Sequence, residues 1–350
     1  MEKEFMQKAL ELSLKGNPSP NPLVGCVITK ANKIIATGFH KKFGEAHAEI
    51  NALKKAGKKA INAEIYVSLE PCTHFKGKKT PACAQAIIKA GLKKVFIALT
   101  DPNKKVKGKG IKQLKKAGIK VETGLLKEKA EKINESFIKF QKTGQPFVTL
   151  KAAITLDGKI ASKTFESKWI SSEESRKKVH EMRSKTDAVL TGENTVLKDN
   201  PKLTARIKGG RNPLRVIVTS KKIPSDYNVF VDSNFLIATT DKKLFPEKKF
   251  EGKILELKAK NNLVDLKKLL SELGKRNVSS LLVEGGSGIY SSFVKQKLAD
   301  KLVLFIAPKI LGSGIPVFGG LGVKKPEKAL ELKCVSFSET GKDLLLEGYF

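Results

Sequence analysis

Short apolar runs alternate with helical segments along most of this chain of 350 residues. The first series contains predicted strands at 21–30, 34–40, 63–69, 93–99 and 119–124, and predicted helices at 46–57, 80–91, 109–117 and 127–142. Parallel strands need a crossover connection, and a helix usually supplies it. The alternation therefore predicts a layered α/β domain with a partly parallel sheet.

A second series of the same kind begins after the segment KTGQPF, residues 142–147. This segment places a glycine and a proline between a polar helix and an apolar strand, which is typical of a link between domains. The second series contains predicted strands at 146–156, 187–192, 214–220, 235–240, 253–257, 279–286, 301–308 and 344–350, and predicted helices at 172–185 and 287–297. We therefore predict two α/β domains, residues 1–145 and 146–350.

The formal net charge of +32 is extreme, and a basic surface can indicate a nucleic-acid partner. Here the excess is spread along both halves and consists almost entirely of lysine, with six arginines and none before Arg176. Nucleic-acid surfaces favour arginine forks and aromatic stacking platforms, whereas aromatic residues make up 7% of this chain. The composition therefore favours a general lysine bias, and we predict no nucleic-acid partner. Anionic small substrates would suit such a surface.

The sequence contains no apolar window long enough to span a membrane and no segment typical of a secretory signal. Its four cysteines are too few for a disulfide framework and are more typical of metal ligands or buried residues in a reducing compartment. We expect a cytoplasmic protein without a membrane partner.

Three side chains that commonly bind metals, His47, Cys72 and Cys83, fall at the ends of predicted elements in the first domain. One imidazole and two thiolates suit Zn²⁺, and three protein ligands leave a fourth position for water, as in catalytic sites. Bound zinc lowers the pKa of water toward neutrality. Glu49 would then remain off the metal and carry protons.

Each of these residues also has an ordinary interpretation. A single histidine is more often a surface or core residue, and a single cysteine is more often a small buried one. We interpret Cys26 and Cys334 in this way, as structural residues. The joint occurrence of the other three favours a zinc site. A purely structural zinc module remains an alternative, and it would need a fourth protein ligand, for which His74 is the nearest candidate.

The second domain contains a glycine-rich turn, in the segment SSLLVEGGSGIYSSF at 279–293. A strand, such a turn and a helix let backbone N–H groups approach a phosphate, although two glycines after a strand are often just a turn. Arg183 and Arg206 stand out in a lysine-rich chain, because arginine offers bidentate geometry for phosphate. Their positions could also be chance. The single tryptophan, Trp169, is by residue type more often a core anchor than a stacking wall.

The first site resembles a known family. His-Ala-Glu at 47–49 followed by LEPCTHFKGKKTPAC at 69–83 is similar to the signature of zinc-dependent deaminases of bases and nucleotides. The usual Pro-Cys-x-x-Cys spacing is longer here. A longer gap resembles the deaminase half of the bifunctional riboflavin-biosynthesis deaminase–reductase family, with Ala82 in place of a proline. The segment NPSPNPLVGCVI at 17–28 is similar to the opening strand of that half.

The second domain resembles the reductase half of the same family. The resemblance rests on five segments in order, LKAAITLDGKIA, ESKWISS, TGENTVLKDNPKLTAR, VEGGSGIYSSF and IAPKILG. It covers essentially the whole chain and implies a cytidine-deaminase-like α/β/α layer domain followed by a dihydrofolate-reductase-like α/β domain that uses NADPH.

The resemblance also implies roles for individual residues. Residues expected to contact the cofactor are Ala153, Trp169, Thr195, Asp199, Ser220, Gly286, Ser287 and Gly288. Residues expected to contact substrate are Asn21 and His74 in the first domain and Ser167, Arg183, Leu203, Arg206 and Glu284 in the second. Lys151 matches the family's lysine near the reacting sugar carbon. Lys221 and Lys222 follow Ser220, and we add the hypothesis that they pair with a 2′-phosphate.

The activity that the resemblance implies has two steps. The first is zinc-dependent hydrolytic deamination of 2,5-diamino-6-(5-phosphoribosylamino)pyrimidin-4(3H)-one, and the second is NADPH-dependent reduction of the ribosyl side chain to ribityl. A phosphorylated pyrimidine substrate and a homo-oligomer are therefore expected. The rival interpretation is a base deaminase that holds RNA on its basic surface, and it leaves the reductase-like second domain unexplained.

Overall fold

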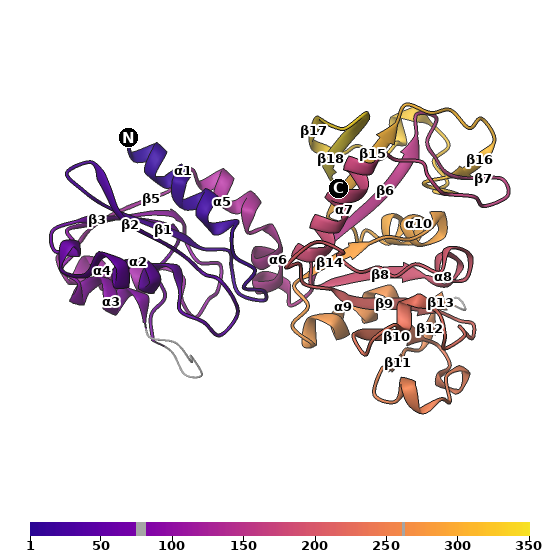
Figure 1. Ribbon diagram of the computed structural model, residues 1–350, viewed down its shortest axis with the longest axis horizontal. Coiled ribbons are helices and arrows are strands. Elements are labelled where there is room, and N and C mark those ends of the chain that lie inside the picture. Colours follow the sequence, from indigo (N-terminus) through magenta and orange to yellow (C-terminus); the bar gives the residue numbers. More distant parts are fainter. Residues whose placement is uncertain (75–81, 261–262) are drawn as a thin grey trace. The chain divides into compact units, whose positions relative to one another are not determined.

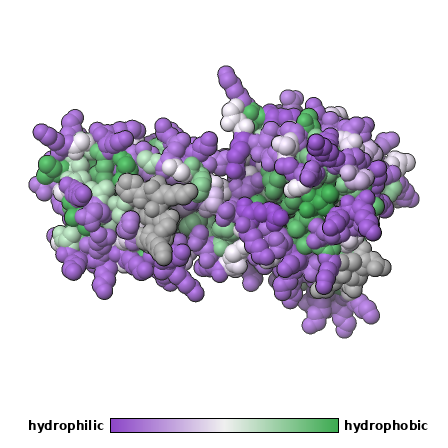
Figure 2. Space-filling view, turned by 90° about the horizontal axis from the view of Figure 1, so that it is seen from below, coloured by the Kyte–Doolittle hydropathy of each residue, from purple (hydrophilic) through white to green (hydrophobic). Residues whose placement is uncertain are grey.

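The computed structural model describes residues 1–74, 82–260 and 263–350. The chain divides into two compact units, Met1–Gly144 and Gln145–Phe350, and the break lies within the segment 142–147. Figure 1 shows a layered α/β arrangement in each unit. Hydrophilic side chains cover most of the face seen in Figure 2, with hydrophobic side chains gathered in smaller areas. Within the described ranges, no helix combines the length and apolar character needed to cross a bilayer.

The first unit is built on a five-stranded sheet with the order β2-β1-β3-β4-β5. β1 runs antiparallel to β2 and β3, whereas β3, β4 and β5 are parallel, so the sheet is partly parallel as predicted. Its elements are α1 (Glu2–Ser13), β1 (Gly25–Lys30), β2 (Lys33–Phe39), α2 (Ala48–Ala56), η1 (Gly57–Ala60), β3 (Glu64–Leu69), α3 (Cys83–Lys89), β4 (Lys94–Leu99), α4 (Lys109–Lys116), β5 (Lys120–Thr123), α5 (Lys127–Ile133) and α6 (Glu135–Thr143).

Helices cover both faces of this sheet. Figure 1 shows α1 and α5 over one face and α2, α3 and α4 over the other, and one continuous apolar core joins these layers. Helix α2 lies very close to β2, because a side chain at Gly38 would collide with the main chain of Ala48 and Ala52. The glycine therefore lets the first turn of α2 rest directly on the sheet.

The second unit contains a nine-stranded sheet with the order β11-β10-β9-β8-β14-β6-β15-β18-β17. The strands from β11 to β15 are parallel, and β18 and β17 add an antiparallel edge. Its elements are β6 (Phe147–Thr155), β7 (Lys159–Ser162), α7 (Glu173–Lys185), β8 (Ala188–Gly192), α8 (Glu193–Asp199), β9 (Leu214–Thr219), η2 (Asn228–Phe230), β10 (Phe235–Thr239), η3 (Lys242–Leu244), η4 (Lys248–Phe250), β11 (Ile254–Glu256), β12 (Ala259–Lys260), β13 (Leu263–Val264), α9 (Leu266–Lys275), β14 (Ser280–Val283), α10 (Ser287–Lys295), β15 (Lys301–Ala307), β16 (Gly314–Pro316), η5 (Pro326–Lys328), β17 (Lys333–Thr340) and β18 (Asp343–Tyr349).

Separate apolar clusters lie on the two faces of this large sheet. Helices α9 and α10 pack on one face through leucines of α9 and Tyr290 and Phe293 of α10. Helices α7 and α8 contribute Val179 and Val196 to clusters on the other face. Residues of β8 alternate between the two clusters, as expected for a strand buried on both faces.

Several elements differ from the sequence predictions. Helix α3 begins at Cys83, after Ala82, rather than near Thr80, which lies outside the described residues. The predicted helix 127–142 is two helices with a break at Asn134. Helices α8 and α9 and the strand β17 were not predicted. Cys26 is buried as expected, whereas Cys334 is exposed on β17 and is not a core residue.

Candidate active sites

His47, Cys72 and Cys83 meet in the first unit. The Sγ atom of Cys72 lies 3.4 Å from Nδ1 of His47, and the Sγ atom of Cys83 lies 3.3 Å from the same nitrogen. All three ligand atoms lie within 4.8 Å of one another. His47 is the N-cap of α2, Cys83 is the first residue of α3, and Cys72 follows the end of β3. The predicted convergence of these three residues is therefore present in the structure.

The segment that carries Cys72 is held by its neighbour Glu70, which sequence reasoning did not identify. The buried carboxylate of Glu70 accepts hydrogen bonds from the backbone N–H groups of Asp101, Gly108, Gly110 and Ile111, at 2.9–3.3 Å. Two of these groups belong to the first turn of α4, where a carboxylate satisfies otherwise unpaired donors. Glu70 thus fixes the end of β3 and the start of the Cys72 segment.

Glu49 lies in the first turn of α2, beside the three ligand residues, and is buried. Among the residues that the structure describes, its Oε2 atom is a buried oxygen without a hydrogen-bond partner. Burial, together with the nearby Cys72, raises the pKa of the carboxyl group. The imidazole and two thiolates form a donor set that fits Zn²⁺ with one position open, and the orphan carboxylate oxygen beside them can carry a proton.

A second histidine, His40, also belongs to this site and was missed by sequence reasoning. Its ring stacks edge-on against His47 at 5.0 Å between centroids, and its Nε2 lies 3.2 Å from the Asn21 side-chain amide. Its Nδ1 lies 3.2 Å from the Ala46 carbonyl oxygen, and burial lowers the pKa of the ring. The sequence did contain one indication of this role, because His40 ends a predicted strand shortly before the ligand His47. Asn21, expected near the substrate, therefore does reach the site.

His74 is exposed and lies apart from the metal-binding group. Within residues 1–74, 82–260 and 263–350, the group contains His47, Cys72 and Cys83 and no fourth protein ligand. His74 instead lines a shallow hollow with Thr73, Ala82 and Gln85. A closed four-ligand structural zinc site that includes His74 is therefore not formed by these residues.

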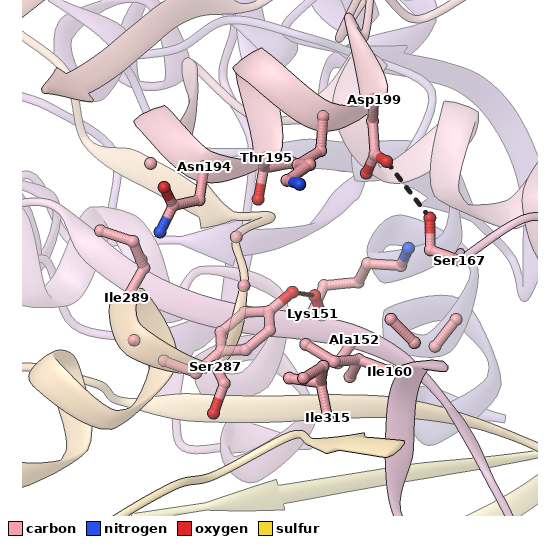
Figure 3. Close-up of a pocket in the computed structure, with 18 of the residues that line it drawn as sticks. Lys151, Ala152, Ile160, Ser167, Asn194, Thr195, Asp199, Ser287, Ile289 and Ile315 are labelled. Carbon is pink, nitrogen blue, oxygen red and sulfur yellow. Dashed lines mark hydrogen bonds between the residues drawn. The ribbon is translucent and has the colours of Figure 1, made fainter. Parts of the chain in front are cut away.

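The second unit contains a cavity of about 770 Å³. Sequence-predicted residues that line it are Lys151, Ala153, Ser167, Trp169, Arg183, Thr195, Asp199, Arg206, Ser220, Gly286, Ser287 and Gly288. Figure 3 shows Lys151 reaching from β6 toward Ser167 and Asp199, with Asn194 and Thr195 on α8 at the opposite side from Ile160 and Ile315. The cavity thus combines one polar wall with one apolar wall, as is usual for a small-molecule site.

Four residues predicted for this site do not line the cavity: Leu203, Glu284, Lys221 and Lys222. The side chain of Leu203 is buried in the apolar cluster next to α8, so its main chain alone remains for contact with a substrate. Glu284 is not among the lining residues, and its carboxylate pairs with Arg183 through bonds of 2.6 and 2.9 Å and approaches the Lys151 amine at 3.6 Å. Glu284 is therefore placed to position two cations of the cavity, and its contact with the phosphorylated substrate stays a prediction.

The three charges of this buried group influence one another. Burial alone would raise the pKa of Glu284, but Arg183 and Lys151 lower it to about 2. Burial lowers the pKa of Lys151, while Glu284 opposes that change. A buried carboxylate between two cations is compensated only while both remain in place.

The tryptophan is exposed and not a core anchor. Trp169 is 65% exposed, and the guanidinium of Arg176 lies over its ring at 4.5 Å from the centroid. Both side chains line the cavity. Because the ring is exposed, the core interpretation favoured by residue type is wrong. A large ring that lines a cavity offers a stacking surface instead.

The glycine-rich turn faces the same cavity. Gly286 is the N-cap of α10, and Gly285 to Gly288 all contribute to the lining. A side chain at Gly288 would meet no atom within 4 Å, so the space beside it is open. This turn and the first backbone N–H groups of α10 fit a pyrophosphate.

Comparison with known proteins places both units in one family. The family model described as the RibD C-terminal domain matches residues 146–346. The model described as the cytidine and deoxycytidylate deaminase zinc-binding region matches residues 1–99. The riboflavin biosynthesis protein RibD of Aquifex aeolicus is 41% identical over 354 residues, covering 99% of this chain and 98% of that protein. The chain belongs to the RibD family.

Solved RibD structures agree over the same length. RibD from Acinetobacter baumannii, form 1, superimposes with a TM-score of 0.90 at 35% identity, covering 99% of this chain and 98% of that one. The diaminohydroxyphosphoribosylaminopyrimidine deaminase/5-amino-6-(5-phosphoribosylamino)uracil reductase from Thermotoga maritima has a TM-score of 0.89 at 39% identity, with 99% and 98% coverage. The predicted fold class, a deaminase-like unit followed by a reductase unit, is confirmed.

As a RibD-family protein, the chain is a bifunctional enzyme of riboflavin biosynthesis with deaminase and reductase activities. Its cofactors are zinc, in the deaminase unit, and NADPH, in the reductase unit. The donor set described above fits the zinc ion, and the cavity with its glycine-rich turn fits the dinucleotide.

Proposed function

We propose that residues 1–145 carry out the deamination and residues 146–350 the reduction, with the substrates named in the sequence analysis. The observation that carries this proposal is the group of His47, Cys72 and Cys83 next to the orphan carboxylate of Glu49. A cavity with several cations in the other unit supports a second activity on an anionic substrate.

In the deaminase unit, His47, Cys72 and Cys83 would hold zinc, which supplies an activated water when bound. Glu49 would take a proton from that water on its Oε2 atom and deliver it to the departing amino group. His40 and Asn21 would help to orient the pyrimidine, since both lie at the same site. His74 stays a predicted substrate contact.

In the reductase unit, the α10 turn with Gly286, Ser287 and Gly288 would bind the cofactor pyrophosphate. The other proposed cofactor contacts are Ala153, Trp169, Thr195, Asp199 and Ser220, all of which line the cavity. NADPH supplies the hydride. Lys151, held by Glu284, would orient the sugar carbon that is reduced.

The phosphate of the substrate would bind at Arg206. Its guanidinium lines the cavity, and no carboxylate of the described residues lies within ion-pair distance of it. Arg183, beside it, is largely occupied by Glu284 and would contribute its remaining N–H groups. Ser167, which bonds Asp199 at 3.4 Å, would complete the substrate contacts.

Loss of one metal ligand tests the first half of the proposal. Cys83→Ser is expected to reduce zinc from about one ion per chain to a small fraction and to abolish deamination, because a hydroxyl is a far weaker zinc ligand than a thiolate. Metal analysis and ammonia release measure the two effects. Cys334→Ser, at the exposed cysteine, is the matched control and should change neither. Undiminished zinc in Cys83→Ser would contradict the proposed ligand set.

Lys221 and Lys222 are proposed to favour NADPH over NADH. In the structure they pair with Glu193 at 3.3 Å and Glu247 at 3.5 Å, and both lysines are exposed. Replacing both by glutamate is expected to raise KM for NADPH about tenfold while KM for NADH changes little. The reason is that NADPH carries the 2′-phosphate with which the lysines are proposed to pair, whereas NADH lacks it. Steady-state kinetics with each cofactor measure the ratio. Lys324→Glu with Lys325→Glu is the control, and equal losses for both cofactors would refute the hypothesis.

A cytoplasmic location, self-association into a homo-oligomer and the absence of nucleic-acid binding remain predictions. The four free cysteines are compatible with a reducing compartment.

A further inference from the structure

The loop that presents Arg206 to the reductase cavity is fastened to helix α7. Leu203 and Arg206 both have positive φ angles, of 53° and 47°, a conformation that is unfavourable for residues with side chains. The Thr204 carbonyl oxygen between them accepts hydrogen bonds from His180 Nδ1 at 3.2 Å and Arg183 Nη1 at 3.1 Å. Because His180 and Arg183 are three residues apart on α7, they share one face of the helix.

This contact determines which nitrogen of His180 carries the proton. A carbonyl oxygen can only accept, so Nδ1 must donate to Thr204. Burial, together with the charges of Arg183 and Arg206, lowers the pKa of the imidazole, so the ring is neutral at physiological pH. A neutral ring with a protonated Nδ1 leaves a lone pair on Nε2.

His180 lines the cavity together with three side chains that can only donate hydrogen bonds. Lys151, Arg183 and Arg206 have only N–H donors to offer, and all three line the same cavity. Such donors bind phosphate oxygens but cannot accept a hydrogen bond from a hydroxyl. His180 lines the same cavity, and its Nε2 can act as a hydrogen-bond acceptor there.

We propose that His180 is a further specificity-determining residue of the reductase, whose Nε2 accepts a hydrogen bond from a sugar hydroxyl next to the phosphate held at Arg206. Its role is to position the substrate and not to transfer hydride or protons. The inference rests on the proposed phosphate site. It means that His180 helps the cavity to distinguish a sugar phosphate from a bare phosphate.

The two nitrogens of His180 can be tested separately. In His180→Asn, the amide N–H can replace Nδ1–H in the bond to Thr204, but no atom reaches the position of Nε2. In His180→Gln, the longer side chain brings an amide oxygen to the region of Nε2. Ribose 5-phosphate and inorganic phosphate serve as probes, each measured as an inhibitor of NADPH oxidation by the full-length enzyme with its cofactor bound.

His180→Asn is expected to weaken inhibition by ribose 5-phosphate about three- to tenfold, the usual effect of one neutral hydrogen bond, with inhibition by phosphate unchanged. KM for the reductase substrate should rise by the same factor, while KM for NADPH and the rate of deamination stay constant. His180→Gln should recover part of the ribose 5-phosphate affinity.

Unchanged inhibition by both probes in His180→Asn would overturn the inference. An equal loss of inhibition by both probes would also overturn it, because the side chain would then act through the loop or on the phosphate. Arg206→Ala separates this inference from the proposed function. This variant should weaken inhibition by both probes. If inhibition by inorganic phosphate is unchanged in Arg206→Ala, the proposed phosphate site itself is wrong.

Discussion

Glu49→Gln is expected to lower the rate of deamination about 10³-fold while zinc remains bound. Glutamine has nearly the same shape as glutamate but cannot take up a proton from water and release it to a leaving amine, and general acid–base catalysis contributes about 10²- to 10⁴-fold. The three ligands, His47, Cys72 and Cys83, are unchanged by the substitution. The Oε2 atom of Glu49, unpaired among the described residues, marks the carboxylate as a group placed for a substrate and not for the fold.

The measurement combines ammonia release with metal analysis on the same preparation. Reduction by the second unit, followed as NADPH oxidation on deaminated substrate, should be normal and so reports that the chain is folded. Glu45→Gln, an exposed carboxylate just before the ligand His47, is the matched control and should leave deamination intact. If Glu49→Gln kept the full rate of deamination, Glu49 would not be the group that carries the proton, and if zinc were lost as well, Glu49 would belong to the ligand set.

The zinc site was predictable because its signal is local. His47, Cys72 and Cys83 each follow or begin a helix or strand that composition and spacing reveal, and parallel strands and their crossover helices bring such ends together at one edge. Glu70 and His40 were not found, since their roles depend on contacts across the fold. The carboxylate of Glu70 serves backbone N–H groups at residues 101–111, and no sequence pattern marks that partnership.

In the second unit the sequence was less informative. The pairing of Arg183 with Glu284 spans 101 positions, and only the assembled sheet brings these two residues together. The core position that residue type favours for Trp169 was also wrong, because the exposure of this ring depends on the assembled fold. Helix α8 is short and mostly polar, and β17 is an exposed edge strand in which Val335 and Phe337 give only a brief apolar alternation. Helix α9 could have been predicted from its Asp265 cap and the spacing of its buried leucines.

Glu284→Gln is expected to destabilise the second unit by about 3–5 kcal/mol, the usual effect of removing one member of a buried ion pair. Arg183 and Lys151 would then be buried cations without their carboxylate, and repulsion between them would no longer be offset. Reductase activity should fall with stability, because both cations line the cavity. Deamination in the first unit should be unaffected.

The single tryptophan makes the measurement specific, since Trp169 lies in the second unit and its fluorescence reports unfolding of that unit. Glu272→Gln is the matched control. Glu272 also pairs with several cations, Lys268, Lys275 and Arg276, but these pairs lie at the surface of α9 and should matter much less. Equal destabilisation by the two variants would contradict the importance assigned to burial.

The pH dependence gives a second, independent readout. The pKa of Glu284 is about 2 in the folded protein against an ordinary value of 4.5, so the folded state favours the ionised form. The stability that this preference contributes is fully present above pH 4.5 and is lost as the pH falls from 4.5 toward 2. The stability difference between the natural protein and Glu284→Gln should therefore shrink over that interval. A constant difference across it would mean that the carboxylate contributes through packing and not through its charge.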